Sequence, residues 1–573
     1  MKITISKSLY NHIETRKIIM ENNYESFGSS KLESTEEGTV TAEVFVKKKI
    51  KEPVYWQYLI KELVKESEKE NIEELIPKKY SNFDVIVIFN IPDTSELYFT
   101  NFGQAFNDIN KFIDVNFGIQ FAEKSIRKRD VTSKKVAYFK QNRLREITNF
   151  RRNISNNFRA SESYTSLTGY PESKERFGNT VDCSSGVSFN VSGDPLNFKK
   201  NLVDLLLNIH ELMQIKDKLN SFPRLEIIRE NELINDLDNQ MFEHIKKLIN
   251  GEETGNEEIF ITRIFEHNNR IVILDQIEKA YIYKKGLKSK TKKIFMESQL
   301  SFIDIIMEFI ISNDIMNIED IYIELHESDR KSYVSIKKLL HFEINKENRQ
   351  YLLLDGYWGE FNNDFIELID ESLSSIVINF NKLSFNESFN GTEDDYIQKL
   401  EEANGDDFKV LHKKFVRASN PNTIMKGTGI ELADIYNTSS NEILAIKNGV
   451  DTTKSIYSIE QSILGISTLI EKNDFDFSDI IDVLGNTHFE KLNSVNYNGL
   501  IWILPLNQGD GLPIKDVTHT NNVKNKRFKL QDLGSILLKS KLVEWAEFSR
   551  ENRFEPVIYL ETPTQHKSIE NSK

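Results

Sequence analysis

The amino-acid sequence predicts a mixed α/β protein of several domains. The chain of 573 residues is longer than one hydrophobic core usually serves. Segments with apolar side chains at every second position alternate with segments of helical period. Apolar residues make up 39% of the chain, a little below the globular average, and 37 Phe and 20 Tyr supply large areas to bury. We therefore expect about three domains that fold without help.

The first predicted domain covers residues 1–200. Residues 39–48 and 83–91 have the pattern of strands, and residues 54–67 that of an amphipathic helix. Residues 124–159 hold twelve Lys or Arg against Asp130 and Glu146. Such a segment is ordinarily a solvated surface neutralised by acidic neighbours. The functional alternative is a strip that contacts nucleic-acid phosphates through Arg127, Lys128, Arg129, Arg151 and Arg152.

Residues 201–385 form the second predicted domain. Helical patterns at 198–219 and 235–250 precede strand pairs at 257–267 and 269–275. A Lys cluster at 283–293, including Lys284 and Lys285, lies in a predicted loop and is a second candidate for phosphate contacts. Asp355-Gly356 between apolar runs predicts a hairpin with a type I′ turn.

A sheet flanked by helices is predicted for the third domain, residues 386–561. Helical patterns at 395–405, 455–472 and 527–552 alternate with strand patterns at 430–447, 497–506 and 556–561. The tail, 562–573, is expected to be disordered.

Several functional classes lack their usual signatures. The net charge of −14 argues against coating nucleic acid or an anionic membrane with the whole surface. The chain has no P-loop, GxGxxG, HExxH or GxSxG motif, no signal peptide and no run of 18 apolar residues. Cys183, the single cysteine, is expected to be a free structural thiol. These features predict a cytoplasmic protein that does not cross a membrane.

One segment, residues 430–447, has the pattern of a chemical site. Two β-type runs flank the turn-forming residues 437–441, so an antiparallel pair is expected. Alternation places Asp434 in an apolar row with Ile430 and Leu432, where a lone carboxylate needs compensation. Lys447, on the partner strand, is the predicted partner. Glu431 is expected to point away from Asp434 unless a bulge re-aims it.

This layout is that of a restriction-endonuclease-like fold, in which two carboxylates hold Mg²⁺ and a lysine orients the attacking water. Asp434, Lys447 and Gln461 of the following helix are the catalytic candidates. The residue two before the lysine, acidic in that fold, is Ala445 here. The metal would therefore need Glu431, Glu442 or a helix acid such as Glu401 or Glu402. The ordinary interpretation is a buried Asp–Lys pair in a structural sheet.

The chain also resembles a sporadically distributed family of large bacterial proteins of unknown function. Trp56 carries this resemblance, together with the stretches FIDVNFGIQFAEKSIRKRDV, LTGYP, SSGVSF, LLLDGYWGEFNNDFI, DYIQKL, LHKKFV, GIELADIYNTSSNEILAIKNG and SIYSIEQ. Family members tend to lie near mobile restriction and phage-defence genes. The resemblance matches Asp434, Lys447 and Gln461 to the family pattern, whereas Ala445 stands where the family usually has His. It implies a defence-associated role by context and names no reaction.

Three hypotheses follow. The first is a Mg²⁺-dependent nuclease in anti-phage defence, acting on DNA or RNA. The second is a non-catalytic protein that binds nucleic acid or senses a phage component, with a structural hairpin. The third is a toxin-like enzyme acting on tRNA or nucleotides. An acidic chain with basic patches could also form a homo-oligomer.

Overall fold

A computed structural model of the chain shows a mixed α/β protein, as predicted. It describes residues 2–33, 38–51, 80–109, 112–137, 145–149, 162–190, 197–249, 259–261, 264–267, 270–273, 277, 279–284, 292–294, 299–313, 315, 317–327, 330–346, 349–380, 383, 392–418, 429–448, 452–503 and 529–561. The chain folds as two compact units. Unit 1 comprises Met1–Ala137, Arg145–Phe158 and Tyr164–Phe222, and unit 2 comprises Tyr138–Leu144, Arg159–Ser163 and Pro223–Lys573. The three-domain division stays a prediction.

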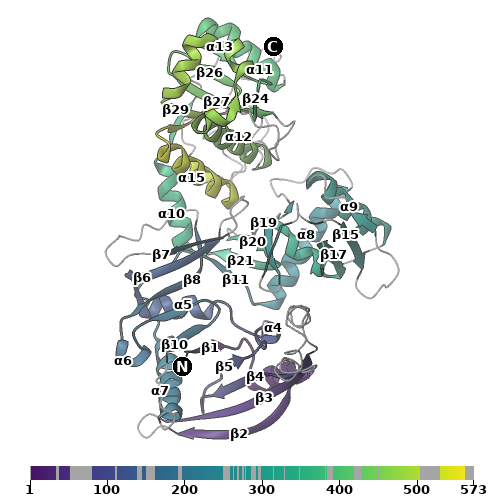
Figure 1. Ribbon diagram of the computed structural model, residues 1–573, viewed down its shortest axis with the longest axis vertical. Helices are drawn as coiled ribbons and strands as arrows, with labels where there is room; N and C mark the ends of the chain where they lie inside the picture. Colours follow the sequence, from purple (N-terminus) through teal and green to yellow (C-terminus); the bar gives the residue numbers. More distant parts are fainter. Residues whose placement is uncertain are drawn as a thin grey trace, which may run out of the picture. The chain divides into compact units, whose positions relative to one another are not determined.

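Unit 1 is built on a ten-stranded sheet in the order β2-β3-β4-β5-β1-β10-β9-β8-β6-β7 (Figure 1). Its strands are β1 (Lys2–Lys7), β2 (Glu25–Glu33), β3 (Thr39–Lys51), β4 (Tyr80–Asn90), β5 (Leu97–Phe102), β6 (Ile126–Ala137), β7 (Arg145–Asn149), β8 (Ser163–Pro171), β9 (Val181–Cys183) and β10 (Val187–Asn190). Its helices are α1 (His12–Glu21), α4 (Phe106–Ile109), α5 (Phe117–Ser125), α6 (Lys174–Phe177) and α7 (Phe198–Gln214).

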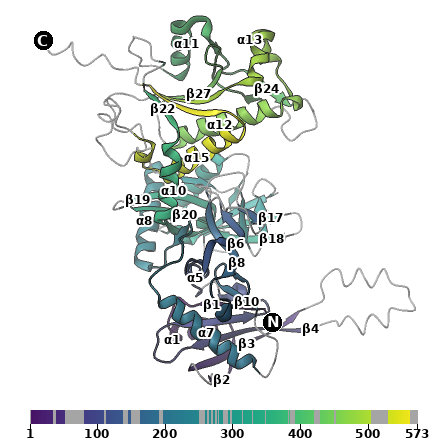
Figure 2. The ribbon, with the colours of Figure 1, turned by 90° about the vertical axis from the view of Figure 1, so that its left-hand side faces the viewer.

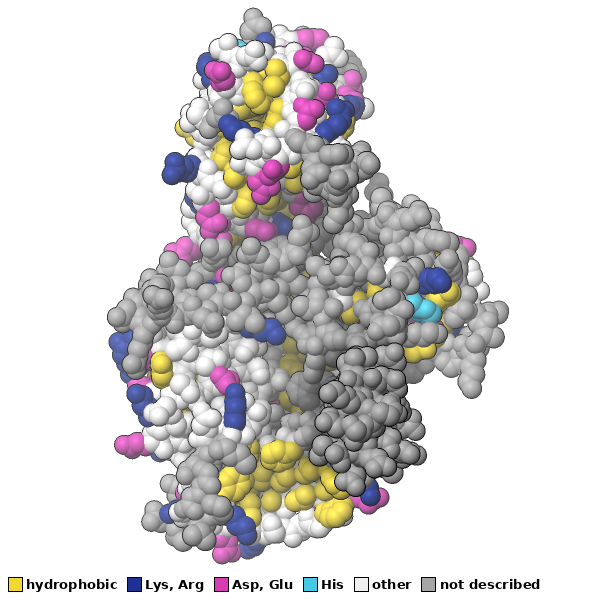
Figure 3. Space-filling view, viewed as in Figure 1, with side chains coloured by type: hydrophobic (Ala, Val, Ile, Leu, Met, Phe, Trp, Pro, Cys, Tyr) yellow, Lys and Arg dark blue, Asp and Glu magenta, His cyan; other side chains and the backbone are white. Residues whose placement is uncertain are grey.

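Period-2 patterning explains the long strands of unit 1. One face of β3, β4 and β5 packs with α1 around a core that includes Ile19, Phe45 and Phe99. Apolar side chains also gather at the surface over β3 and β4 (Figure 3). The strands predicted at 39–48 and 83–91 and the helix predicted from residue 198 are confirmed. The helix predicted at 54–67 lies outside the described residues.

The middle part of unit 2 contains a five-stranded, a four-stranded and a two-stranded sheet, in the orders β11-β21-β20-β19-β12, β16-β15-β17-β18 and β13-β14. The strands are β11 (Leu225–Ile227), β12 (Ile259–Ile261), β13 (Ile264–His267), β14 (Arg270–Ile273), β15 (Lys279–Lys284), β16 (Lys292–Ile294), β17 (Ile321–Glu327), β18 (Arg330–Ser335), β19 (Leu340–Lys346), β20 (Arg349–Leu354) and β21 (Tyr357–Phe361). The accompanying helices are α8 (Asn231–Ile249), α9 (Gln299–Ser312) and α10 (Asn363–Ser374). Asp355 and Gly356 both have positive φ, 52° and 83°, which confirms the predicted type I′ turn.

A six-stranded sheet in the order β22-β30-β29-β27-β26-β23 forms the C-terminal part of unit 2. Its strands are β22 (Val377–Phe380), β23 (Phe408–Val410), β26 (Ile435–Asn437), β27 (Glu442–Asn448), β29 (Tyr497–Ile503) and β30 (Glu555–Glu561). The β22, β30, β29 and β27 strands run parallel, whereas β26 is antiparallel to both β27 and β23. A small antiparallel sheet of β25 (Ile430–Glu431), β24 (Phe415–Ala418) and β28 (Phe475–Asp476) adjoins it in sequence.

Helices cover both faces of the six-stranded sheet, as predicted (Figure 2). The face with Leu444 and Ile446 packs against α11 (Glu393–Asn404). The opposite face, with Ala445 and Trp502, packs against α12 (Thr452–Ile470), α15 (Ile536–Glu551) and α10. A further helix, α13 (Ser478–Lys491), packs with α12 and β24 in a neighbouring core. No helix within the described ranges is long and apolar enough to cross a bilayer.

Candidate functional site

Asp434 is the buried centre of a polar cluster near the carboxyl end of β27. It lies between β25 and β26, where the chain leaves regular strand geometry for residues 432–434. The side chain is 1% exposed. Its Oδ2 accepts the Ile446 amide of β27 at 2.6 Å, and its own amide donates to the Leu444 carbonyl at 2.9 Å. The carboxylate therefore continues the hydrogen-bond ladder where main-chain pairing stops.

His412 is the charged partner of Asp434. It lies in a turn between β23 and β24, closed by the Lys414 amide donating to the Leu411 carbonyl at 2.9 Å. The turn is held to Asp434 because the amides of Leu411 and His412 both donate to the Asp434 carbonyl, at 2.8 and 3.0 Å. This places His412 Nδ1 at 2.7 Å from Asp434 Oδ1.

Further carboxylates surround the imidazole of His412. Nδ1 is 3.1 Å from Glu431 Oε1, and Nε2 is 2.9 Å from Asp394 Oδ1. The hydrogen bond to Asp434, helped by the charges of Asp434 and Glu431, raises the pKa of His412 to about 9 against the opposing effect of burial. At neutral pH the ring is therefore an imidazolium that donates to carboxylates from both nitrogens.

Glu431 points into the cluster, so the prediction that it faces away from Asp434 was wrong. Its Oε1 accepts the Lys413 amide at 2.5 Å, and its Oε2 accepts Gln461 Nε2 of α12 at 3.2 Å. Alternation fails because β25 ends at Glu431 and the chain bends before β26 begins. Burial raises the pKa of Glu431 above its ordinary value, although the Lys413 amide counteracts this.

Lys447 pairs with Glu393 of α11 rather than with Asp434, which corrects the predicted partner. Its Nζ lies 3.1 Å from Glu393 Oε2 and 4.8 Å from the centroid of the Tyr457 ring on α12. Ala445, two residues earlier, is 2% exposed and packs in the core with α12. The position that holds an acid in a restriction-endonuclease-like site is thus apolar here, and α11 brings a carboxylate instead.

Three side chains could hold a metal ion together. One ligand atom from each of Glu393, His412 and Asp434 lies within 4.8 Å of the other two. Carboxylate oxygen and imidazole nitrogen are common ligands of divalent cations. The sequence predicted Asp434 in this role and named helix acids such as Glu401 or Glu402. In this group the acid comes from the first turn of the same helix, α11.

Glu442, the other predicted metal ligand, lies apart from this cluster. It begins β27, five residues before Lys447, or roughly 16 Å along the strand. Both of its oxygens accept the Tyr559 hydroxyl, at 2.9 and 3.0 Å, and Ser440 donates to Oε2 at 3.2 Å. Burial raises the pKa of Glu442 to about 7. Its surroundings are those of a buried structural carboxyl.

Glu393, Asp394 and His412 were not predicted as site residues. The sequence did contain a signal for Glu393 and Asp394. Thr392 and Asp395 form a capping box, which starts α11 two residues before the predicted helix and so includes both acids. The residues around His412 contain no comparable motif that predicts its place in the cluster. It reaches Asp434, 22 positions away, only through the turn that follows β23.

The basic residues predicted to contact phosphates are partly described. Arg127 pairs with Glu172, and Arg129 lies 3.9 Å from Asp130, so acids are interleaved with this stretch. Lys128 is exposed on β6, and Lys284 ends β15 with a half-buried side chain. Arg151, Arg152 and Lys285 lie outside the described residues.

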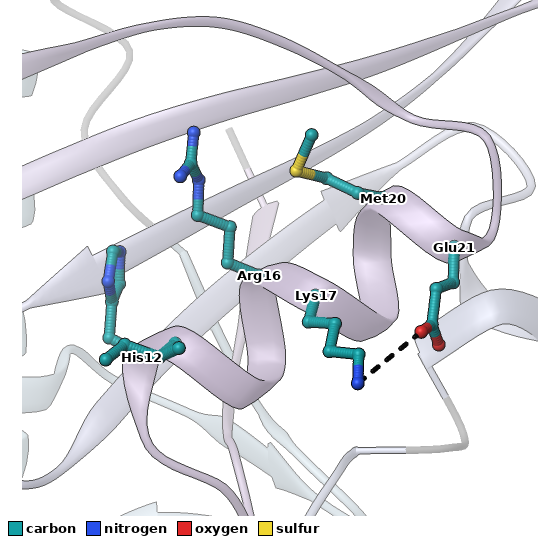
Figure 4. A pocket seen from close by; sticks show the side chains of 6 residues that line it. His12, Arg16, Lys17, Met20 and Glu21 are labelled. Atoms are coloured by element: carbon teal, nitrogen blue, oxygen red, sulfur yellow. Dashed lines mark ion pairs between the residues drawn. The ribbon is translucent and has the colours of Figure 1, made fainter.

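Described residues of unit 1 line two surface pockets. One, of about 490 Å³, follows the exposed side of α1, where Lys17 and Glu21 pair at 3.9 Å (Figure 4). His12 and Arg16, which also line it, contact Glu43. The other, of about 710 Å³, is lined by Lys124, Lys174, Arg176 and Lys218 together with Glu172, Glu175 and Asp217. Cys183 is a free thiol, as predicted, and it is fully buried, which raises its pKa.

Comparison with known proteins gives a family and no activity. No curated protein matches the chain. The model of a family of unknown function, DUF6119, matches residues 7–476. This range contains Glu393, His412, Asp434, Lys447 and Gln461, and it ends before β29, α15 and β30. Because the match spans most of its length, the chain belongs to the DUF6119 family of unknown function.

Proposed function

We propose that this protein is a metal-dependent nuclease whose active site is the cluster around Asp434. One observation carries the proposal. Ligand atoms of Glu393, His412 and Asp434 converge within 4.8 Å, and Lys447 contacts the same Glu393 at 3.1 Å. A cation site with a fixed lysine beside it is what phosphodiester hydrolysis requires, because negative charge develops on the phosphate in the transition state.

The donor set fits a divalent cation. Two carboxylates and one imidazole suit Mn²⁺ and also permit Mg²⁺, the ion expected from the sequence, and His412 would have to release its proton to bind either ion. Such an ion, when bound, would polarise the phosphate and lower the pKa of a bound water. The chain itself supplies the orientation: Gln461 holds Glu431, and Lys447 presents a cation beside Glu393.

The arrangement of elements supports the same proposal. Asp434 and Lys447 lie on neighbouring antiparallel segments, and the helix that follows carries Gln461 into the cluster. A mixed sheet covered by helices on both faces surrounds them. This is the layout expected of a restriction-endonuclease-like core. Anti-phage defence and a cytoplasmic location are proposed as the setting, on the sequence resemblance and composition alone.

The test compares the full-length wild type with Asp434→Asn and Glu393→Gln on plasmid DNA and on RNA, with Mg²⁺, Mn²⁺ or EDTA. We expect metal-dependent cleavage by the wild type and a loss of at least about a hundredfold in both variants. The matched control is Glu442→Gln, which replaces a buried carboxyl at the other end of β27 and should cleave normally. Equal, metal-independent results for wild type and Asp434→Asn would remove the proposal.

One observation favours the alternative, a non-catalytic protein that binds nucleic acid or senses a phage component. Each carboxylate of the cluster already has a partner in the chain: His412 for Asp434, Gln461 for Glu431 and Lys447 for Glu393. The imidazolium could thus balance the acids without a metal. Calorimetric titration with Mn²⁺ separates the two. The nuclease proposal predicts a heat of binding in the wild type that Asp434→Asn abolishes, whereas the alternative predicts the same result for both proteins.

A further inference from the structure

Exposed rings lie directly beside the polar cluster. Tyr457 on α12 is 54% exposed, although its ring contacts Lys447 at 4.8 Å. Lys447 in turn touches Glu393, one of the three candidate metal ligands. An exposed aromatic ring in this place can stack on a planar group of a ligand that reaches the cluster.

A second ring lies next to Glu431. Phe415 on β24 is 37% exposed and stands opposite Glu431 in the β24–β25 ladder, so the two side chains share a face. Glu431 is held by Gln461, which comes four residues after Tyr457 and three before Leu464 on α12. These spacings put all three α12 side chains on one side of the helix, and Leu464 is 41% exposed. Phe415, Tyr457 and Leu464 thus border the polar cluster.

Nucleobases are the ligands that suit such rings beside a phosphate-binding centre. Stacking of a base on an aromatic side chain is sequence-tolerant and requires that the face of the base be free. In a duplex each base is covered by its neighbours, whereas in a single strand the bases can be splayed out. Lys413, 64% exposed and paired with Asp394, and Lys447, paired with Glu393, are the cations beside these rings.

We infer that this site takes single-stranded nucleic acid, with bases stacked on Tyr457 and Phe415 and the intervening phosphate at the Glu393–His412–Asp434 cluster. The inference rests on the proposed function, because it takes the same cluster as the site, but it predicts which ligand binds there and not whether the ligand is cut. Four acids, Glu393, Asp394, Glu431 and Asp434, outnumber the two lysines, Lys413 and Lys447, here. Strand binding therefore depends on a divalent cation that offsets the acids.

The experiment measures fluorescence anisotropy of a labelled 12-nucleotide strand, of its duplex and of a labelled mononucleotide. The full-length protein is used with Ca²⁺ or EDTA, and gels verify that the strand is intact. We expect the single strand to bind at least about tenfold more tightly than the duplex or the mononucleotide, and only with Ca²⁺. Tyr457→Ala and Phe415→Ala should each weaken binding about tenfold, and Tyr457→Phe should not.

Tyr497→Ala is the matched control. Tyr497 is 40% exposed but pairs with Glu442, at the opposite end of β27, so its replacement should leave binding unchanged. Equal affinity for strand and duplex, tight binding of the mononucleotide alone, or full binding by Tyr457→Ala would overturn the inference. If the strand binds as expected but is not cut with Mg²⁺ or Mn²⁺, the proposed nuclease activity fails and the inferred binding site stands.

Discussion

At the scale of single residues, the buried carboxylates of this hairpin differ in the groups that donate hydrogen bonds to them. Asp434 is almost fully buried and accepts from the Ile446 amide and from His412. Glu442, on the same hairpin, accepts from the hydroxyls of Tyr559 and Ser440. Burial without a charged partner favours the protonated form of a carboxyl, and it raises the pKa of Glu442. The two acids, which look alike in sequence, therefore have different chemistry.

His412 should make the stability of the protein fall as the pH rises. Its pKa is raised to about 9 in the folded state, against about 6.5 in an unfolded chain. The stabilisation is complete below about pH 6.5 and is lost as the pH passes 9. We expect the difference in melting temperature between wild type and His412→Gln, measured in EDTA, to shrink across this window. A constant difference from pH 6 to 10 would contradict the assignment.

Glu442 should respond in a different window. Burial raises its pKa to about 7, so ionisation costs stability that grows as the pH rises from about 4.5 to 7. Glu442→Gln keeps the shape and the Tyr559 contact without the charge. Its melting temperature should rise relative to wild type over that window and stay higher above pH 7. The exposed Glu401→Gln serves as control and should show no such trend.

At the scale of elements, the start of α11 determines where Glu393 lies. The Thr392 hydroxyl accepts the Asp395 amide at 3.3 Å, and Asp395 accepts the Thr392 amide at 2.7 Å. Thr392→Ala should cost about 1 kcal/mol and fray the turn that carries Glu393. We expect a lower melting temperature and weaker Mn²⁺ binding by calorimetry, with Thr392→Ser close to wild type. If Thr392→Ala binds Mn²⁺ normally, the cap does not position Glu393.

The turn before β24 is the other element that builds the cluster. Lys413 has φ 60°, a left-handed conformation that favours glycine. Its amide donates to Glu431 at 2.5 Å, and its Nζ reaches Asp394 at 2.5 Å. A lysine kept in this conformation brings two site acids to one turn.

At the scale of the whole molecule, the two compact units should unfold as separable transitions. Of the four Trp, Trp358, Trp502 and Trp545 are buried in unit 2, so Trp fluorescence mainly follows that unit. Leu206→Ala, at a fully buried position of α7 in unit 1, should cost roughly 2–5 kcal/mol. We expect it to shift the circular-dichroism transition in denaturant and to leave the fluorescence transition in place.

The control for this prediction lies in α15. Leu542 is equally buried in unit 2, so Leu542→Ala should move the fluorescence transition. If Leu206→Ala moves both transitions together, the units unfold as one cooperative body.

The sequence by itself determined the mixed α/β class, the long strands β3, β4, β27, β29 and β30, the helices α7, α8, α11, α12 and α15, the Asp-Gly hairpin and the burial of Asp434. These follow from local periods and turn residues, which act over a few positions. Only the tertiary structure decided that His412 and Glu393, rather than Lys447 and Glu442, surround Asp434. The bend at residues 432–434 breaks the two-residue alternation, and a turn 22 positions away is joined to Asp434 by main-chain hydrogen bonds. No spacing in the sequence encodes such long-range contacts, because they arise from how separate strands meet in the sheet.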